Sequence, residues 1–230
     1  MNGHFIKLTK EAVKEISKNN LTGMVLSYLC CNQGVGTGVC RTNINEIVSN
    51  SGCTCDRHST TGINRRVKNC LIELEKDGFI SNLDDPVTET NIYIQKASYA
   101  DDLYLEPYNP SEKFVMIYTE NYYKLIQYSL KNGYKFADLI NLYIFIISHI
   151  NRSIPNAFCN TSTITMQKAL NISEHTLDKY TKALIDCGLI RKKRGDAEHS
   201  NQYFLTDNFE ETDKRSALVA ADDEEDGTAF

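Results

Sequence analysis

The chain has 230 residues, of which 41% are hydrophobic and 24% charged, a composition typical of globular proteins that excludes global disorder. Its formal net charge of -5 comes from two segments: residues 101–112 hold four acidic residues and no basic one, and residues 208–230 hold eight acidic and two basic ones. The net charge is +1 over residues 1–100 and +4 over residues 113–207. A nucleic-acid partner is therefore not excluded, because local surface charge sets the field that a phosphate meets.

The sequence gives no sign of export or of a membrane-spanning segment. Its N-terminus lacks the apolar stretch and the cleavage site of a signal peptide. The most apolar run, Leu139 to Ile150, is too short to cross a bilayer and is expected to form a buried core helix. The eight cysteines should then be reduced, without a disulfide framework. We expect a cytoplasmic protein with no membrane partner.

The first half of the sequence predicts an opening segment, three helices and a hairpin. FIKLTKEA begins at Phe5, and an amphipathic or buried helix, LTGMVLSYLCC, begins at Leu21. The extended piece GVCRT ends in Thr42, a predicted N-cap, and the short helix NINEIVSNSG follows it. A longer helix comes next, and the hairpin ISNLDDPVTETNIYI begins at Ile80. The apolar residues of the longer helix repeat with the helical period, which predicts one buried face: Ile63, Val67, Cys70, Leu71 and Leu74.

The second half predicts the same elements in the same order. FVMIYTEN begins at Phe114, and the helix FADLINLYIFIISHI begins at Phe136. AFCNTS supplies a predicted N-cap, Ser162 or Thr161, for the short helix TITMQKALN. The hairpin is IRKKRGDAEHSNQYFL. The longer helix before it carries a predicted buried face of Leu177, Tyr180, Leu184 and Ile185.

Both long helices end in a glycine followed by an apolar pair. Gly78 precedes Phe79-Ile80, and Gly188 precedes Leu189-Ile190. A glycine at this point adopts the left-handed conformation that ends many helices.

The repeated order of helix, short helix, turn, long helix and hairpin is typical of a winged helix. We predict an α+β, mainly helical protein with two tandem winged-helix domains, each a helix-turn-helix plus a β-hairpin. The first domain spans residues 1–97, and an acidic, proline-containing linker spans residues 98–112. The second domain spans residues 113–207, and residues 208–230 form an acidic tail that is predicted to be disordered.

Candidate DNA-binding residues follow from the angle of about 100° per residue round each long helix, because the exposed N-terminal face of the second helix in a helix-turn-helix enters the major groove. In the first half this face carries Thr61, Arg65 and Lys68, Asn64 flanks it, and Arg57 and His58 lie at the entry of the helix. In the second half, after the predicted N-cap Ser173, the candidate residues are His175, Thr176, Lys179 and Lys182. Aligning Gly78 with Gly188 places Arg65 and His175 at equivalent positions. The alternative is an ordinary solvated helix face, which also carries lysine and arginine.

The two hairpins differ in charge. The second begins with four consecutive basic residues, Arg191, Lys192, Lys193 and Arg194, which suit a phosphate backbone or a minor groove. A solubilising loop or a localisation-like run is the alternative interpretation. The tip of the first hairpin carries Asp84 and Asp85, which phosphate would repel, so this wing stays off DNA or meets a partner protein.

The sequence contains no convincing catalytic or metal-binding motif. Cys53-x-Cys55 with His58 lacks the usual C-x2-4-C spacing and has no obvious fourth ligand nearby. Gly34 to Gly38 matches no phosphate-binding loop, and the five histidines form no paired motif. We therefore expect no enzyme activity, no metal and no cofactor.

Ser162 to Leu177, STITMQKALNISEHTL, looks like a helix-turn-helix that turns through Leu170-Asn171-Ile172-Ser173. A chain of two such units resembles, over residues 1–207, the replication initiators of plasmids and phages. Part of it also resembles the N-terminal domain of phage replisome organisers. The resemblance implies sequence-specific binding of double-stranded DNA, in replication initiation or transcription control.

The same resemblance implies that the two units have different roles. One unit would support contacts of a homodimer while both touch DNA. The acidic first wing would be a partner surface and the basic second wing a DNA surface. The acidic tail is a candidate for contacting a replisome or host protein. The alternative function is a protein-interaction module that does not bind DNA, because winged helices can use the same face for proteins.

Overall fold

The computed structural model describes residues 5–34, 38–56, 61–82, 101–105, 114–195 and 200–208. These residues fold into eight α-helices, one short 3-10 helix, η1 (Thr206–Asn208), and three small antiparallel sheets. The predicted α+β, mainly helical class is confirmed.

The same order of elements occurs twice along the chain. The first half consists of β1 (Phe5–Thr9), α1 (Lys10–Glu15), α2 (Thr22–Asn32), β2 (Val39–Thr42), α3 (Ile44–Asn50), α4 (Ile63–Lys76), β3 (Ile80–Asn82) and β4 (Asp101–Leu105). The second half consists of β5 (Phe114–Tyr118), α5 (Thr119–Asn132), α6 (Phe136–Ser148), β6 (Phe158–Cys159), α7 (Thr163–Leu170), α8 (Glu174–Asp186), β7 (Ile190–Lys193) and β8 (Gln202–Leu205). Even the strand orders of the two three-stranded sheets correspond, β2-β4-β3 and β6-β8-β7.

The opening strands of the two halves pair with each other. β1 and β5 are antiparallel, with Phe5 opposite Tyr118 and Thr9 opposite Phe114. Their inward side chains, including Ile6 and Ile117, are buried. Because Lys7 lies opposite the equivalent position, Met116, the two opening strands are related by a local two-fold rotation. The sequence predicted similar opening segments but contained no indication that they join.

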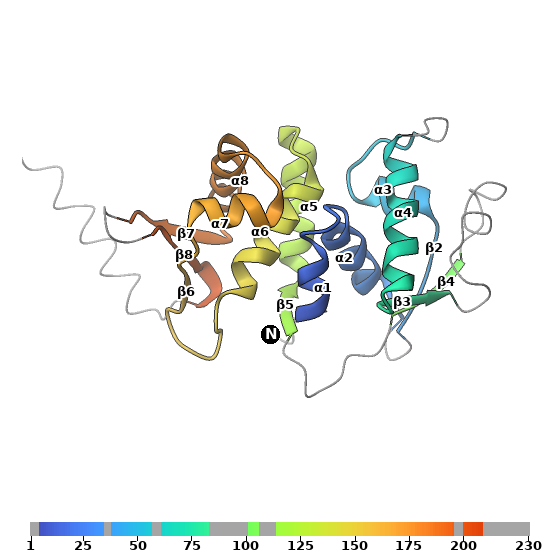
Figure 1. Ribbon diagram of the computed structural model, residues 1–230, viewed down its shortest axis with the longest axis horizontal. Helices are drawn as coiled ribbons and strands as arrows, with labels where there is room; N and C mark the ends of the chain where they lie inside the picture. The colour runs from blue at the N-terminus through green and yellow to red at the C-terminus, as the bar shows by residue number, and fades with distance from the viewer. Residues whose placement is uncertain are drawn as a thin grey trace, which may run out of the picture.

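The helices between the two outer sheets form a shared core. Figure 1 shows α1, α2, α5 and α6 in the middle of the molecule, with α3 and α4 on one side and α7 and α8 on the other. α6 is buried along most of its length and packs against α2, α5 and α8. The predicted buried core helix is therefore confirmed. Among the helices of the described residues, none combines the length and apolar character that crossing a membrane requires.

The α2–α6 contact is close because α2 carries a glycine there. A Cβ on Gly23 would overlap with the side-chain oxygen of Asn141 in α6. The side-chain nitrogen of Asn141 donates to the backbone oxygen of Asn20 at 2.7 Å. Gly23 therefore permits a helix crossing that ties the halves together.

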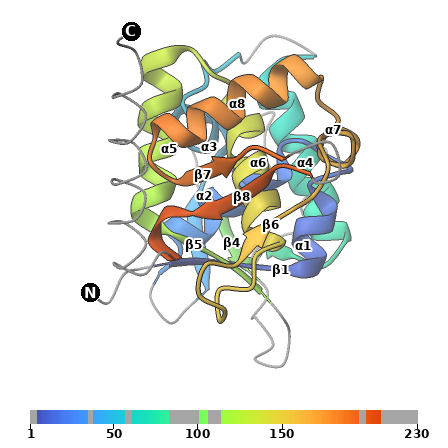
Figure 2. The same cartoon turned by 90° about the vertical axis from the view of Figure 1, so that its left-hand side faces the viewer.

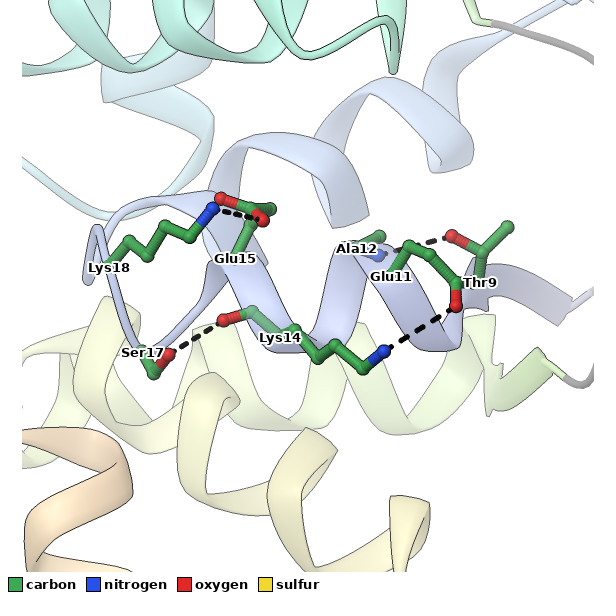
Figure 3. A network of polar contacts seen from close by, with 7 residues as sticks. All are labelled: Thr9, Glu11, Ala12, Lys14, Glu15, Ser17 and Lys18. Carbon is green, nitrogen blue, oxygen red and sulfur yellow. Dashed lines mark hydrogen bonds and ion pairs between the residues drawn. The ribbon is translucent and has the colours of Figure 1, made fainter.

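Local hydrogen bonds and ion pairs stabilise α1 (Figure 3). The sequence pattern did not reveal this helix. The hydroxyl of Thr9 accepts from the backbone of Ala12 at 3.1 Å. Lys14 pairs with Glu11 at 3.7 Å, and Lys18, just beyond the helix, pairs with Glu15 at 2.7 Å. With six residues, α1 is too short to show a periodic signal.

The end signals of the helices were largely correct. Ser162 and Ser173 cap α7 and α8, each through a 3.2 Å bond from a backbone nitrogen. Gly78 and Gly188 have the predicted left-handed φ, 77° and 67°. The N-cap of α3 is Asn43, whereas Thr42 was predicted. Thr42 ends β2 instead.

Two predicted segments were wrong in detail. Strand β4 lies inside residues 98–112, the predicted linker, and it supplies the strand that pairs with β3. Ile185, predicted on the buried face of its helix, is 39% exposed because it lies about 80° from Leu177 round the helix. Three other predictions fall outside the described residues: the return strand before residue 95, the acidic tip at Leu83 to Pro86, and the acidic tail after residue 208.

All eight cysteines are free thiols. Cys40 and Cys70 are completely buried, and burial raises the pKa of Cys70 to about 12. The thiolate is the nucleophile, so a thiol with this pKa stays protonated and unreactive at about pH 8. We expect iodoacetamide at about pH 8 to leave both residues unmodified in the folded protein and to modify them in urea. Peptide mass spectrometry measures this, and rapid native labelling of Cys70 would contradict it.

Candidate nucleic-acid interface

Helix α8 is held in place by a short connection and one buried face. Only residues 171–173 separate it from α7, and Asn171 makes the turn in the left-handed conformation with φ 51°. Leu177, Tyr180 and Leu184 are buried against the core. This anchoring leaves the opposite face of α8 to solvent.

Three of the four predicted residues on α8 project from the exposed face. His175, Lys179 and Lys182 are exposed. Thr176 is half-buried, and its hydroxyl lies 2.9 Å from that of the N-cap Ser173, so it stabilises the start of the helix. The structure therefore brings together two lysines and a histidine on one face.

Lys179 rests on a group of tyrosines. Its ammonium group lies 4.7 Å from the ring centroid of Tyr134, which follows α5. The Tyr134 ring packs against those of Tyr128 and Tyr180, each with centroids 5.5 Å apart. Burial raises the pKa of Tyr180 to about 12, so this phenol stays neutral. The ring quadrupole attracts a cation above its face, which restrains the position of the ammonium group. Sequence reasoning placed Tyr180 on the buried face of its helix but did not identify this group, because Tyr128 and Tyr134 come from a separate segment of the chain.

The basic residues of the second hairpin form an exposed strand and its continuation. Arg191, Lys192 and Lys193 lie in β7 and Arg194 follows it, and all four are exposed. The buried Ile190 anchors the start of the strand. The ammonium group of Lys192 lies 5.9 Å from the ring centroid of Tyr203 in β8. The predicted basic run is thus held on a regular strand, as Figure 2 shows for β7 and β8.

The first half presents fewer of its predicted residues. Lys68 is only 2% exposed, so its assignment to the exposed face was wrong. It lies about 100° from Val67 round the helix, beside the buried stripe rather than opposite it. Arg65 is half-buried, and Thr61 is exposed. Arg57 and His58 lie outside the described residues.

Asn64 holds the start of α4 in place. Its side-chain oxygen accepts from the backbone of Asp56 at 2.8 Å, and its nitrogen donates to the side chain of Asn45 in α3 at 2.8 Å. Lys68 comes one turn later, on the same flank that faces α3. Sequence reasoning also missed Arg66, which donates to Asn20 at 2.9 Å. These bonds fix α4 against neighbouring segments of the first half.

The cysteines near α4 make ordinary polar contacts. The sulfur of Cys55 lies 3.2 Å from the hydroxyl of Ser49 and 3.5 Å from the backbone oxygen of Asn45. The third candidate ligand, His58, lies outside the described residues. Nowhere in the described parts of the chain do three or more histidine, cysteine, aspartate or glutamate side chains gather closely enough to hold a metal ion.

The two sets of candidate residues occupy different ends of the molecule. Figure 1 places α4 on one side and α8, β7 and β8 on the other, with α5 and α6 between them. The candidate residues of the second half include an exposed helix face and an exposed basic strand. Among the described candidate residues of the first half, mainly Thr61 and Arg65 reach the surface. No protein-family model, no curated protein and no solved structure matches the chain.

Proposed function

We propose that the chain is a sequence-specific double-stranded DNA-binding protein of plasmid or phage type, acting in replication initiation or transcription control. Each half is then a winged helix, with α3–α4 and α7–α8 as the helix-turn-helix pairs and the last two strands of each half as the wing. The observation that supports this most is that the exposed basic face of α8 and the exposed basic strand β7 belong to one half.

The two parts of this surface have different roles. The start of α8 enters the major groove, where His175 and Lys179 reach base edges and lysine can donate to guanine. The residues Arg191–Arg194 lie along the phosphate backbone or in the minor groove and supply affinity that does not depend on sequence. Release of counterions from DNA makes this contribution sensitive to salt.

The direct test is a fluorescence-anisotropy titration of labelled random duplex DNA at several salt concentrations, followed by selection from a random duplex pool. We expect salt-dependent binding and an enriched motif. Repeated direct sites would favour replication initiation, and a single inverted repeat near a promoter would favour transcription control. Absence of binding at low salt would refute the proposal.

Arg65 and Lys179 test whether α4 and α8 read bases. Replacing either by alanine is expected to cost about 1–3 kcal/mol of binding to the selected site and to relax the preference at particular positions. Selection repeated with each variant measures this. Lys131→Ala, at an exposed residue in the last turn of α5, is the control and should leave the motif unchanged. An unchanged motif with the Lys179 variant would contradict the role of α8.

A protein-interaction module is the second candidate. It is favoured by the first half, where Lys68 is buried and Asn64 is occupied within the fold. A partner protein rather than DNA would then contact α4. The Lys179→Ala variant separates the two functions, because a protein-interaction module that uses α4 should still bind its cellular target.

A further inference from the structure

The sheet β6-β8-β7 exposes aromatic rings on its outer face. Its inward side chains, including Cys159, Tyr203 and Leu205, are buried. The alternating neighbours Phe158 and Phe204 point the other way; Phe158 is 39% exposed and Phe204 is half-buried. The two rings pack against each other with centroids 5.3 Å apart. Figure 2 views this sheet with its strands in front of α6.

The register of the sheet places cations beside these rings. Arg191 lies opposite Phe204, and Lys193 lies opposite Gln202, on the same face as the phenylalanines. Phe158 pairs with Phe204 from the other side. Phe158, Phe204 and Arg191 therefore lie side by side in one row across the sheet. Lys193 lies two residues further along β7 on the same face.

A second aromatic and basic group lies next to this sheet. The guanidinium of Arg152 lies 5.2 Å from the ring centroid of Tyr118 in β5 and 3.3 Å from the carboxylate of Asp207, which follows β8. On the outer face of the β1–β5 pair, the ammonium group of Lys7 lies 5.3 Å and 5.0 Å from the ring centroids of Phe5 and Phe114. Arg152 thus connects β5 to the segment that follows β8.

We propose that the outer face of β6-β8-β7 binds single-stranded nucleic acid. Unpaired bases stack on Phe158 and Phe204, and the phosphates that connect them contact Arg191 and Lys193. Proteins that bind single strands without sequence preference combine these two features, because every base offers a π-face and every nucleotide a negative charge. The phosphates of a duplex could also contact the cations, but its bases could not stack on the rings, since they are already stacked on one another. The binding of unpaired strands goes beyond the binding of duplex DNA proposed for α8 and the basic residues of β7, because it adds the aromatic rings of the outer face.

A tryptophan reporter tests the contact directly. The chain contains no tryptophan, so Phe158→Trp introduces a single one into the full-length protein. We expect an oligothymidine of about 15 nucleotides, near the upper site size of a single-strand-binding domain, to quench its emission saturably. A duplex of the same length should quench it much less. Tyr123→Trp is the matched control: Tyr123 is exposed on α5, and its ring packs against that of Tyr122 with centroids 5.4 Å apart. Its emission should not respond to the oligothymidine.

Removal of the ring provides the second measurement. Phe158→Ala is expected to weaken oligothymidine binding about tenfold in an anisotropy titration, while duplex affinity changes less than about twofold. Equal affinity of the variant and the original chain for oligothymidine would overturn the proposal, as would an emission of the Phe158→Trp variant that does not respond to it. A protein-concentration-dependent blue shift without DNA would assign the face to a second copy of the chain instead. Failure of duplex binding alone affects the proposed function and leaves this test intact.

Discussion

Replacing Gly23 by alanine is expected to lower the free energy of unfolding by about 3 kcal/mol. The new methyl group would overlap with the side-chain oxygen of Asn141 and lie 3.0 Å from a methyl carbon of Ile144. Asn141 is 3% exposed and bonded to Asn20, so it cannot move aside without losing that bond. The higher helix propensity of alanine offsets only about 1 kcal/mol. Urea denaturation followed by circular dichroism measures the loss.

Two further variants separate a steric cause from a general sensitivity of α2. Ser27 lies one turn after Gly23, and its buried hydroxyl has no hydrogen-bond partner among the residues that the structure describes, so Ser27→Ala should be neutral or stabilising. Asn141→Ala should destabilise the original chain, because it removes the bond to Asn20, but should restore part of the stability lost in Gly23→Ala. Additive effects of the Gly23 and Asn141 changes would show that the two residues do not clash.

Elements with a strong local signal were predictable from the sequence. α6 could be placed from its apolar composition, and α8 from its periodic apolar residues between Ser173 and Gly188. In both cases the information lies within a few turns of one helix. The repeated order of elements was visible for the same reason, since each copy carries its own caps and apolar stripe.

Features that depend on distant segments were not predictable. The pairing of β1 with β5 joins strands from opposite halves of the chain, and neither strand contains a sign of its partner. Strand β4 lies within an acidic, proline-containing segment and is defined by hydrogen bonds to β2 and β3. The same limit explains why Lys68 was wrongly assigned to the exposed face. The angle round α4 shows how far a residue lies from the apolar stripe, but it does not show whether a neighbouring helix covers that flank.

The candidate site was likewise only partly predictable from the sequence. The exposed residues of α8 and β7 were found from one helix angle and one run of bases, and the structure leaves them exposed. The support for Lys179 from Tyr134, and the ring pair of Phe158 and Phe204, come from tertiary contacts between separate elements. Sequence thus located the charges, whereas the surfaces that surround them required the fold.

Replacing Arg191, Lys192 and Lys193 by alanine is expected to weaken binding to every duplex sequence on the order of 100-fold, since each lost charge-assisted contact is worth about 1 kcal/mol or more. The slope of log affinity against log salt should become shallower by about two to three units, because about 0.9 counterion is released per neutralised phosphate. The selected motif should stay the same, since phosphate contacts carry no direct sequence information. Anisotropy titrations of a random duplex and of the selected site measure all three effects.

A variant with the same loss of charge elsewhere makes this prediction specific to β7. Lys10, Lys14 and Lys18 lie on or beside α1, and all three are exposed. Lys14 and Lys18 already pair with glutamates (Figure 3). Replacing these three by alanine changes the net charge equally and should alter the salt slope by less than about one unit. If both triple variants weakened binding alike, total charge rather than the β7 strand would account for DNA affinity. If the β7 variant changed only the selected motif, the strand would read bases instead of phosphates.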